Sequence, residues 1–451
     1  MRHMTMYPRL KQLNWCFSAV LIVSFGLRAG GGTTAILSYA VLSAYALFGR
    51  VQAIHALILS WFITMINNGL VPEANSLGAG RYLVIFAAAV SVGSRALKSS
   101  NFNVKKLSFY TVVFSLFLLA HSLFFSYSVD VSVLKILAWA LVVLTLLSAW
   151  QSLSAEEQAL VFKQIENFLL ALMLVSVPLL SLPAIGYLRN EVGFQGILNH
   201  PQAFGPTAAL LAAMIAGRAL STRHPRWIDV LLVLFCFTLV FLSGARTAGL
   251  AVIFGLISAV LFCPFFAGVS RANLAPALKS GRTKLIVFLG LLLAVSAGPQ
   301  IVPQIKGYLF KQSDASSLLD AAEASRGDLI QKMLSNIQMR PLTGIGFGIA
   351  SNPAEMEVER DGLFGLPLSA IVEKGVMPIA LVEELGIVGA LIALAWILIV
   401  LRRGATAGIQ KFAVLVTLLL VNLGESMLFS VGGMGLLLLI LMTGAIRGEV
   451  R

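Results

Sequence analysis

Apolar residues run through the chain in stretches of about 17 to 25, separated by short polar segments. Each stretch is long enough to cross roughly 30 Å of hydrocarbon as a helix. No region alternates polar and apolar residues with a period of two, so a transmembrane β-barrel is excluded. Helices remain, because lipid offers backbone groups no hydrogen-bond partner. The pattern predicts an all-α fold, a polytopic transmembrane helix bundle.

We expect about fourteen spans, and twelve or thirteen are also compatible because several stretches are short or closely coupled. The expected spans lie near residues 12–29, 32–49, 52–69, 82–97, 107–127, 131–150, 160–183, 202–220, 227–243, 246–266, 283–303, 378–401, 409–424 and 427–446. The chain then divides into N-terminal spans at 1–183, central spans at 184–303, a long loop at 304–377 and C-terminal spans at 378–451.

The long loop has a helical pattern of its own. Between Leu318 and Ile337, apolar residues recur at three- and four-residue spacing, which predicts an amphipathic helix lying on the mouth of the bundle. Pro341 ends this pattern, and the glycine-rich stretch that follows at 344–348 predicts turns. Long loops with internal structure are commonly functional.

Composition supports a membrane protein. Only 12% of the residues are charged and 58% are hydrophobic, and the mean hydropathy is +0.89, whereas soluble domains carry about 25% charged residues. The net charge of +13 does not indicate a nucleic-acid partner, because no basic run is interleaved with aromatic residues on a soluble face.

The basic residues instead set the orientation, because Lys and Arg in short loops stay in the cytoplasm. About 21 of the 33 Lys and Arg residues fall on one side of the expected topology. They are Arg2, Arg9, Lys11, Arg50, Arg95, Lys98, Lys105, Lys106, Lys163, Arg218, Arg223, Arg226, Arg271, Lys279, Arg282, Lys284, Arg402, Arg403, Lys411, Arg447 and Arg451. Both termini are therefore predicted to be cytoplasmic, with residues 304–377 on the opposite side.

The first apolar stretch resembles a signal peptide only in its basic start. Another apolar run begins near Thr33 in place of a polar mature chain, so we expect the first segment to be retained as a helix. Cys16, Cys236 and Cys263 lie in apolar runs without a CxxC pair, which is typical of packing residues.

Two arginines on the non-cytoplasmic side are the first functional candidates, because a charge near a span is costly to bury. Arg246 lies at a span end among small polar residues, and snorkelling to headgroups is its alternative role. Arg326 lies on the amphipathic helix, where a solvated charge is the alternative. Two guanidiniums on one water-facing surface suit a diphosphate, because each can pair phosphate oxygens bidentately. Arg340, and Lys306 or Lys311, would add to that field.

A histidine and two carboxylates form the second group of candidates. His200 precedes a span; it could act as a base, although a lone histidine more often caps or hydrogen-bonds. Glu383 and Glu384 open the span after the long loop. Adjacent carboxylates point to different helix faces, so they do not form an acid–base pair. One of them is expected to orient a sugar hydroxyl or an arginine.

Cofactor motifs are missing. Gly344, Gly346 and Gly348 follow a helix and not a strand, so they do not form a dinucleotide loop. No P-loop, HExxH or GxSxG occurs. We expect no cofactor and no metal, and the energy of any reaction must arrive through the membrane, in a lipid-linked substrate or an ion gradient.

At these residues the chain resembles the O-antigen ligase and polymerase superfamily of bacterial inner-membrane glycosyltransferases. The resemblance covers about residues 185–400 and lies in four ordered motifs. These are Gly196-Ile-Leu-Asn-His-Pro-Gln-Ala-Phe-Gly205, Leu242-Ser-Gly-Ala-Arg-Thr-Ala-Gly249, Arg326 leading to Arg340-Pro-Leu-Thr-Gly-Ile-Gly-Phe-Gly348, and Glu384-Leu-Gly-Ile-Val-Gly389. The first 180 residues contribute only their number of helices.

The resemblance implies glycosyl transfer on the periplasmic face from an undecaprenyl-diphosphate-linked oligosaccharide, with Arg246 and Arg326 holding the diphosphate. Membrane lipids, and a chain-length regulator or flippase of the same pathway, would be its partners. The candidate catalytic residues are Arg246, Arg326, His200 and Glu384. The candidate substrate-binding residues are Arg189, Asn199, Arg340, Glu373 and Lys374.

One departure from the pattern of the ligase branch bears on the choice between ligase and polymerase. Ligases of this superfamily carry a histidine where this chain has Gly375, followed here by Val376. Glu373 and Lys374 lie beside the gap and could contact an acceptor. A repeat-unit polymerase for O-antigen, capsule or exopolysaccharide is therefore favoured, and a ligase is the alternative.

A transporter or lipid-linked oligosaccharide flippase is the rival from another class. Transporters bind their substrates near the bilayer midplane, often through ionisable groups. Few charges lie in mid-span here, and Glu166 and Glu425 lie near span ends. The sequence therefore favours an enzyme over a transporter.

Overall fold

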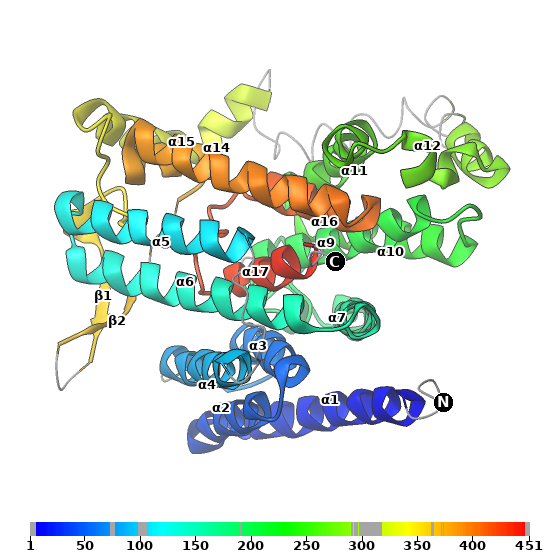
Figure 1. The fold of residues 1–451 in the computed structure, drawn as a ribbon, viewed down its shortest axis with the longest axis horizontal. Coiled ribbons are helices and arrows are strands. Elements are labelled where there is room, and N and C mark those ends of the chain that lie inside the picture. Colours follow the sequence, from blue (N-terminus) through cyan, green and yellow to red (C-terminus); the bar gives the residue numbers. More distant parts are fainter. Residues whose placement is uncertain are drawn as a thin grey trace.

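The computed structural model describes residues 6–72, 77–97, 106–189, 191–289, 292, 296, 318–361, 365–370, 372 and 374–446. Within these residues the fold is a bundle of helices with a single two-stranded hairpin (Figure 1). The fold class expected from the hydrophobic pattern is confirmed.

The described residues up to 189 form eight α-helices and one 3-10 helix. They are α1 (Met6–Ala29), α2 (Gly32–Leu47), α3 (Arg50–Thr64), α4 (Leu77–Leu97), α5 (Lys106–Phe125), α6 (Val129–Ser152), α7 (Ala155–Ser176), η1 (Val177–Ser181) and α8 (Pro183–Gly186). The centre of the chain adds α9 (Pro201–Leu220), α10 (Trp227–Ser243), α11 (Arg246–Ala267), α12 (Arg271–Leu274) and η2 (Pro276–Lys279).

The C-terminal part contains the amphipathic helix, the hairpin and three more apolar helices. They are α14 (Leu318–Met339), η3 (Pro353–Glu355), β1 (Val358–Arg360), β2 (Pro367–Ala370), α15 (Met377–Thr406), α16 (Ile409–Val421) and α17 (Met434–Gly444). The strands β1 and β2 pair antiparallel. The helix expected from Leu318 onward, ended by Pro341, is confirmed as α14, which packs on α15.

Seven of the described helices are long and apolar enough to cross a membrane, and six shorter helices of 10 to 17 residues are also apolar. Together they correspond to thirteen of the fourteen expected spans, and most of the remaining one, at 283–303, lies outside the described residues. The molecule is a multi-pass membrane protein.

Two expected spans are shorter than the apolar pattern suggests. The third, expected to reach residue 69, ends at Thr64 because residues 65–67 turn away to pair with 197–199. Asn199 N donates to Met65 O at 2.8 Å, and Asn67 N donates to Ile197 O at 2.9 Å. The last span, expected from 427, begins only at Met434 because a turn with Gly433 at φ 48° precedes it.

The helix α9 lies at the centre of the bundle. It packs against α7, α10, α11 and α16, and 78% of its span is buried. Alanine and glycine dominate its sequence, which lets neighbouring helix backbones approach closely. Its last turn is held by an ion network in which Arg218 pairs with Glu166 and Asp229.

Figure 1 shows the two ends of the bundle. The long helices α1, α5, α6 and α15 run across the view, with β1 and β2 at the left and α12 at the right. We call the end that carries residues 340–348 and the β1–β2 hairpin the hairpin end.

Candidate active site

The glycine-rich loop at 340–348 is held against the start of α15. Ile345 N donates to Glu383 O and Gly346 N donates to Glu384 O, both at 2.9 Å. In return, Ile387 N donates to Pro341 O at 2.8 Å. Helix α15 can accept these bonds because Gly386 breaks its helical backbone with φ 67° and ψ 177°. The last two sequence motifs therefore form one unit.

Glycine is required at this contact for two reasons. Gly344 and Gly386 both have positive φ, at 63° and 67°, a region that residues with a Cβ rarely adopt. A Cβ on Gly344 would also meet the backbone of Glu384, and one on Gly386 would meet the backbone of Leu342. Backbone atoms cannot move aside as the end of a side chain can, so these glycines allow the close approach of loop and helix.

The same loop is anchored to α5 and α6. Tyr127 N donates to Ile345 O at 3.0 Å, and Ser132 Oγ donates to Phe347 O at 2.7 Å. The guanidinium of Arg340 lies over the Tyr127 ring, 4.1 Å from its centroid. This contact is a cation–π interaction, so Arg340 has a positioning role in addition to its charge.

A buried lysine lies between the two carboxylates of α15. Lys374 Nζ lies 2.7 Å from Glu383 Oε2 and 3.2 Å from Glu384 Oε1. Glu383 is 0% exposed and Lys374 is 4% exposed, so removal of one partner would leave a buried charge uncompensated. Asn336 Nδ2 donates to Glu383 Oε1 at 2.7 Å, and Gly348 N donates to Glu384 Oε2 at 2.7 Å.

The two carboxylates therefore differ in environment. Glu383 is enclosed and bonded to α14, and it joins α14 to α15. Glu384 is also paired, but it lines a pocket of about 140 Å³ together with Lys374. Of the two, Glu384 is the carboxylate that lines the pocket.

Two further cations line this pocket. Lys135, from the first turns of α6, donates from Nζ to Gly348 O at 2.7 Å. Arg81, from α4, lies with its guanidinium 5.3 Å from the centroid of the Tyr82 ring. With Glu383, which pairs with Lys374 from behind the pocket wall, three cations are set against two carboxylates, and an excess of positive charge remains at the pocket, which favours an anionic ligand.

Sequence reasoning missed Lys135 and Arg81, although a signal for Lys135 was present. It is a lysine inside an apolar stretch expected to span the membrane, and such a charge is a functional candidate. Arg81 had no comparable signal, because its position beside Lys135 follows from the packing of α4 on α6.

The first two motifs also meet. Phe194 N donates to Leu242 O at 2.9 Å. A Cβ on Gly205 would overlap Ala245 and Ser243, so only glycine lets α9 approach the turn before α11. His200 is the N-cap of α9, and its Nδ1 accepts a hydrogen bond from Gln202 N at 3.0 Å.

The start of α11 connects the first two motifs with the last two. Arg246 is the first residue of α11, and a Cβ on Gly424 would touch the side chain of Thr247. Two residues further on, Ser426 N donates to Lys374 O at 2.9 Å. The four motifs are thus joined by direct contacts. The first motif, 196–205, contacts the second, 242–249, and the second contacts the segment 422–426. That segment contacts Lys374, which pairs with Glu384 of the last motif, and Glu384 contacts the loop at 340–348. We call this set the motif layer.

The structure describes the remaining candidate residues only in part. Arg326 lies on α14, but its side chain lies outside the described residues, as do Glu373, Lys306 and Lys311. The backbone N–H of Arg189 donates to Gln195 Oε1 at 2.8 Å. Asn199 Oδ1 is buried and has no hydrogen-bond partner in the described part of the chain.

Among the described residues, no three His, Cys, Asp or Glu side chains come together as metal ligands. The three cysteines form no disulfide; Cys16 is exposed and the other two are buried.

Residues 231–367 match the family model described as O-Antigen ligase. The matched segment contains Arg246, Arg326, Arg340 and the glycine-rich loop, and it ends before Lys374 and Glu384. The match supports the O-antigen ligase and polymerase superfamily, and with it a membrane glycosyltransferase of this type. A comparison with curated proteins found no match.

Proposed function

We propose that this protein is a repeat-unit polymerase, which transfers a growing glycan from undecaprenyl diphosphate to the next lipid-linked repeat unit. The observation that carries the proposal is the motif layer. Four motifs that lie far apart in the sequence contact one another beside a pocket with excess positive charge. A glycan linked through a diphosphate carries its negative charge where such a pocket would bind it.

Guanidiniums are the groups that promote the transfer. When an acceptor hydroxyl attacks C1 of the donor sugar, the C1–O bond to the diphosphate breaks and negative charge builds on the leaving group. Fixed cations stabilise that charge in the transition state. Arg246 and Arg326 are proposed to bind the diphosphate, with Arg81 and Lys135 adding to the positive field.

The acceptor hydroxyl loses its proton during the attack. Glu384 lines the pocket, but both of its carboxylate oxygens are already engaged, Oε1 by Lys374 and Oε2 by Gly348 N–H. We therefore assign Glu384 to orienting the hydroxyl, with proton loss late in the attack. Lys374, beside the position where ligases carry a histidine, is proposed to contact the acceptor.

The orientation is part of the proposal. The Lys- and Arg-rich short loops favour cytoplasmic termini in the bacterial inner membrane, and the hairpin end then faces the periplasm. Lipid-linked repeats delivered by a flippase would reach the pocket from that side, and a chain-length regulator would act on the product.

Purified protein in liposomes with a lipid-linked repeat unit tests the proposal. Formation of polymer from the donor alone supports a polymerase. A requirement for a second acceptor, with unlinked polymer accumulating in a deletion strain, supports the ligase instead. Counterflow of labelled substrate without a new glycosidic bond would show a transporter and would reject the enzyme.

A further inference from the structure

A second pocket lies at the opposite end of α6 from the motif layer. Val131 and Lys135, near the start of α6, line the site described above, whereas Ser152 and Leu153, at its end, line this one. Lys135 and Ser152 both lie on α6, which spans Val129–Ser152, and at 1.5 Å per residue they are about 26 Å apart along the helix. The second pocket is the larger, at about 440 Å³, and has no part in the proposed transfer.

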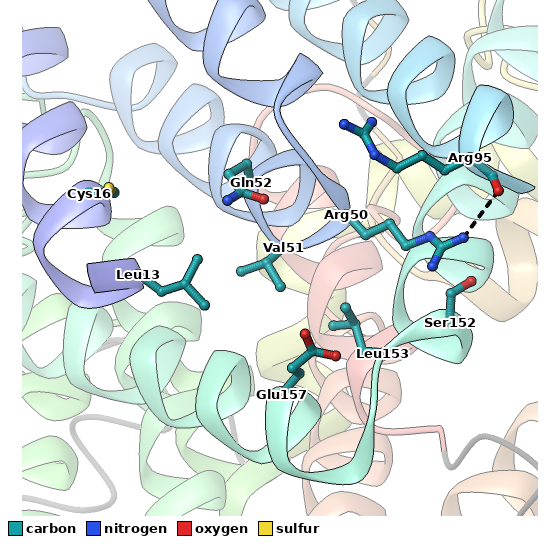
Figure 2. Close-up of a pocket in the computed structure, with 9 residues that line it drawn as sticks. All are labelled: Leu13, Cys16, Arg50, Val51, Gln52, Arg95, Ser152, Leu153 and Glu157. Carbon is teal, nitrogen blue, oxygen red and sulfur yellow. Dashed lines mark hydrogen bonds between the residues drawn. The ribbon is translucent and has the colours of Figure 1, made fainter. Parts of the chain in front are cut away.

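Charges of both signs line this pocket. Arg50 begins α3, Arg95 lies near the end of α4, and Glu157 lies in the first turn of α7. Figure 2 shows the Arg50 guanidinium between the Arg95 carbonyl and Ser152, with the Glu157 carboxylate on the other side of Leu153. No ion pair joins Arg50 to Glu157 among the described contacts.

The two arginines are not equivalent. Arg95 uses its terminal nitrogens on the backbone of α2 and α4, donating to Leu47 O, Phe48 O and Ser91 O at 2.8 to 2.9 Å. Arg50 donates from Nη2 to Arg95 O at 3.3 Å (Figure 2), and in the described part of the chain its other terminal nitrogen, Nη1, makes no hydrogen bond. Arg50 is therefore the cation with donors left for a ligand, and Arg95 positions it.

The rest of the lining is apolar and lies at a membrane boundary. Leu13, Val51 and Leu153 form walls between α1, α3 and α7, and Cys16 brings the pocket to the exposed face of α1. Trp15, next to Cys16, is 70% exposed. Exposed tryptophans mark the headgroup level of a bilayer, and apolar α1 residues such as Ile22, also 70% exposed, continue from there into the lipid.

We infer that this pocket binds the headgroup of an aminophospholipid from the surrounding leaflet, with its phosphate at Arg50 and its ammonium at Glu157. A guanidinium suits a phosphate and a carboxylate suits a primary ammonium, and the two together match a phosphoethanolamine headgroup. The apolar walls and the exposed face of α1 accept its acyl chains. A purely anionic lipid would leave Glu157 opposed to its charge.

Native mass spectrometry of the purified full chain tests this inference. The protein is exchanged into nanodiscs with equal amounts of phosphatidylethanolamine, phosphatidylglycerol and phosphatidylcholine, and the lipid retained after release is counted. We expect phosphatidylethanolamine to be retained about tenfold over the other two, the effect of one charge-assisted hydrogen bond. Equal retention of the three lipids would overturn the inference.

Three variants locate the binding. Glu157→Gln keeps the capping box with Ser154, since Gln serves at that position, but removes the charge; it should abolish the preference for phosphatidylethanolamine over phosphatidylglycerol. Arg50→Gln should lower the retention of both phospholipids, and Arg223→Gln, at an exposed position in another turn, should change neither. An unchanged preference in Glu157→Gln would contradict the assignment.

A soluble competitor separates a lipid from a free phosphate. Glycerophosphoethanolamine has the same headgroup without acyl chains and should displace the lipid only weakly, because it lacks the apolar contacts. Displacement by inorganic phosphate alone would show an anion site and not a lipid site. None of these outcomes depends on glycan transfer, so the inference fails or holds separately from the proposed function.

Discussion

Glu384 accepts a 2.7 Å hydrogen bond from the backbone N–H of Gly348, a residue 36 positions earlier in the chain. This bond places the glycine-rich loop and the carboxylate on one wall of the same pocket. Gly348 O in turn accepts from Lys135 at 2.7 Å, so one loop residue contacts both an anion and a cation of the site. The loop therefore positions charged groups as well as closing the end of the bundle.

The kink at Gly386 should be necessary for this arrangement. We expect Gly386→Ala to abolish glycan polymer and to lower the melting temperature, because its Cβ would overlap the backbone of Leu342. Gly268→Ala is the matched control, with a similar φ of 65° but open space around its Cβ; it should cost only about 1–2 kcal/mol of strain. Equal effects of the two substitutions would show that the docking of the loop is unimportant.

The buried charges of Lys374, Glu383 and Glu384 should depend strongly on one another for the stability of the fold. Lys374→Met leaves Glu383 and Glu384 without their cation, and we expect a loss of about 3–5 kcal/mol in the free energy of unfolding, measured by denaturation in detergent. Adding Glu383→Gln and Glu384→Gln should restore much of it.

The exposed pair of Arg360 and Asp130 at the same end of the bundle is the comparison. Arg360→Met should cost at most about 1 kcal/mol, as exposed ion pairs do. A similar small loss for Lys374→Met would contradict the burial argument.

Two substitutions distinguish a role of His200 as the N-cap of α9 from a role in the reaction. Asn is a good N-cap, so His200→Asn should keep α9 and most of the polymerising activity, whereas His200→Ala should lose about 1 kcal/mol of stability. Should the Asn variant remain folded yet produce no polymer, His200 acts in the reaction. Glycan gels of cells that express each variant, alongside melting curves, give both readouts.

Lys135 should matter for transfer more than for folding. Lys135→Met keeps the length of the side chain but removes a cation from the pocket, and we expect transfer to slow about a hundredfold, as for other lost stabilising donors. Lys163→Met, on a half-exposed lysine of α7, should leave the rate unchanged. Initial rates in liposomes measure both, and a normal rate for Lys135→Met would remove it from the site.

The sequence predicts the helices well because each span is specified by its own apolar residues. The amphipathic helix α14 is predicted for the same reason, since Leu318 to Ile337 carry its period within one segment. The hairpin is missed because β1 and β2 are three and four residues long and include charged Glu359 and Arg360.

The site is predicted only in part because its geometry depends on contacts between distant residues. The motif with Glu384 is visible in the sequence, but its pairing with Lys374 depends on the fold around Gly386. Lys135 and Arg81 come from helices outside all four motifs, and only packing brings them to the pocket. The cap role of His200, by contrast, follows from its position before Pro201.

The length of the glycan made in cells tests the central claim most directly. A deletion strain should be complemented with Arg246→Ala, Arg326→Ala or the exposed control Arg402→Ala, and insertion of each protein measured alongside the glycan ladder. We expect both site variants to yield only single repeat units while the control makes long chains, because only the first two lose a cation for the lipid diphosphate. Long chains of normal length in both site variants would contradict the account.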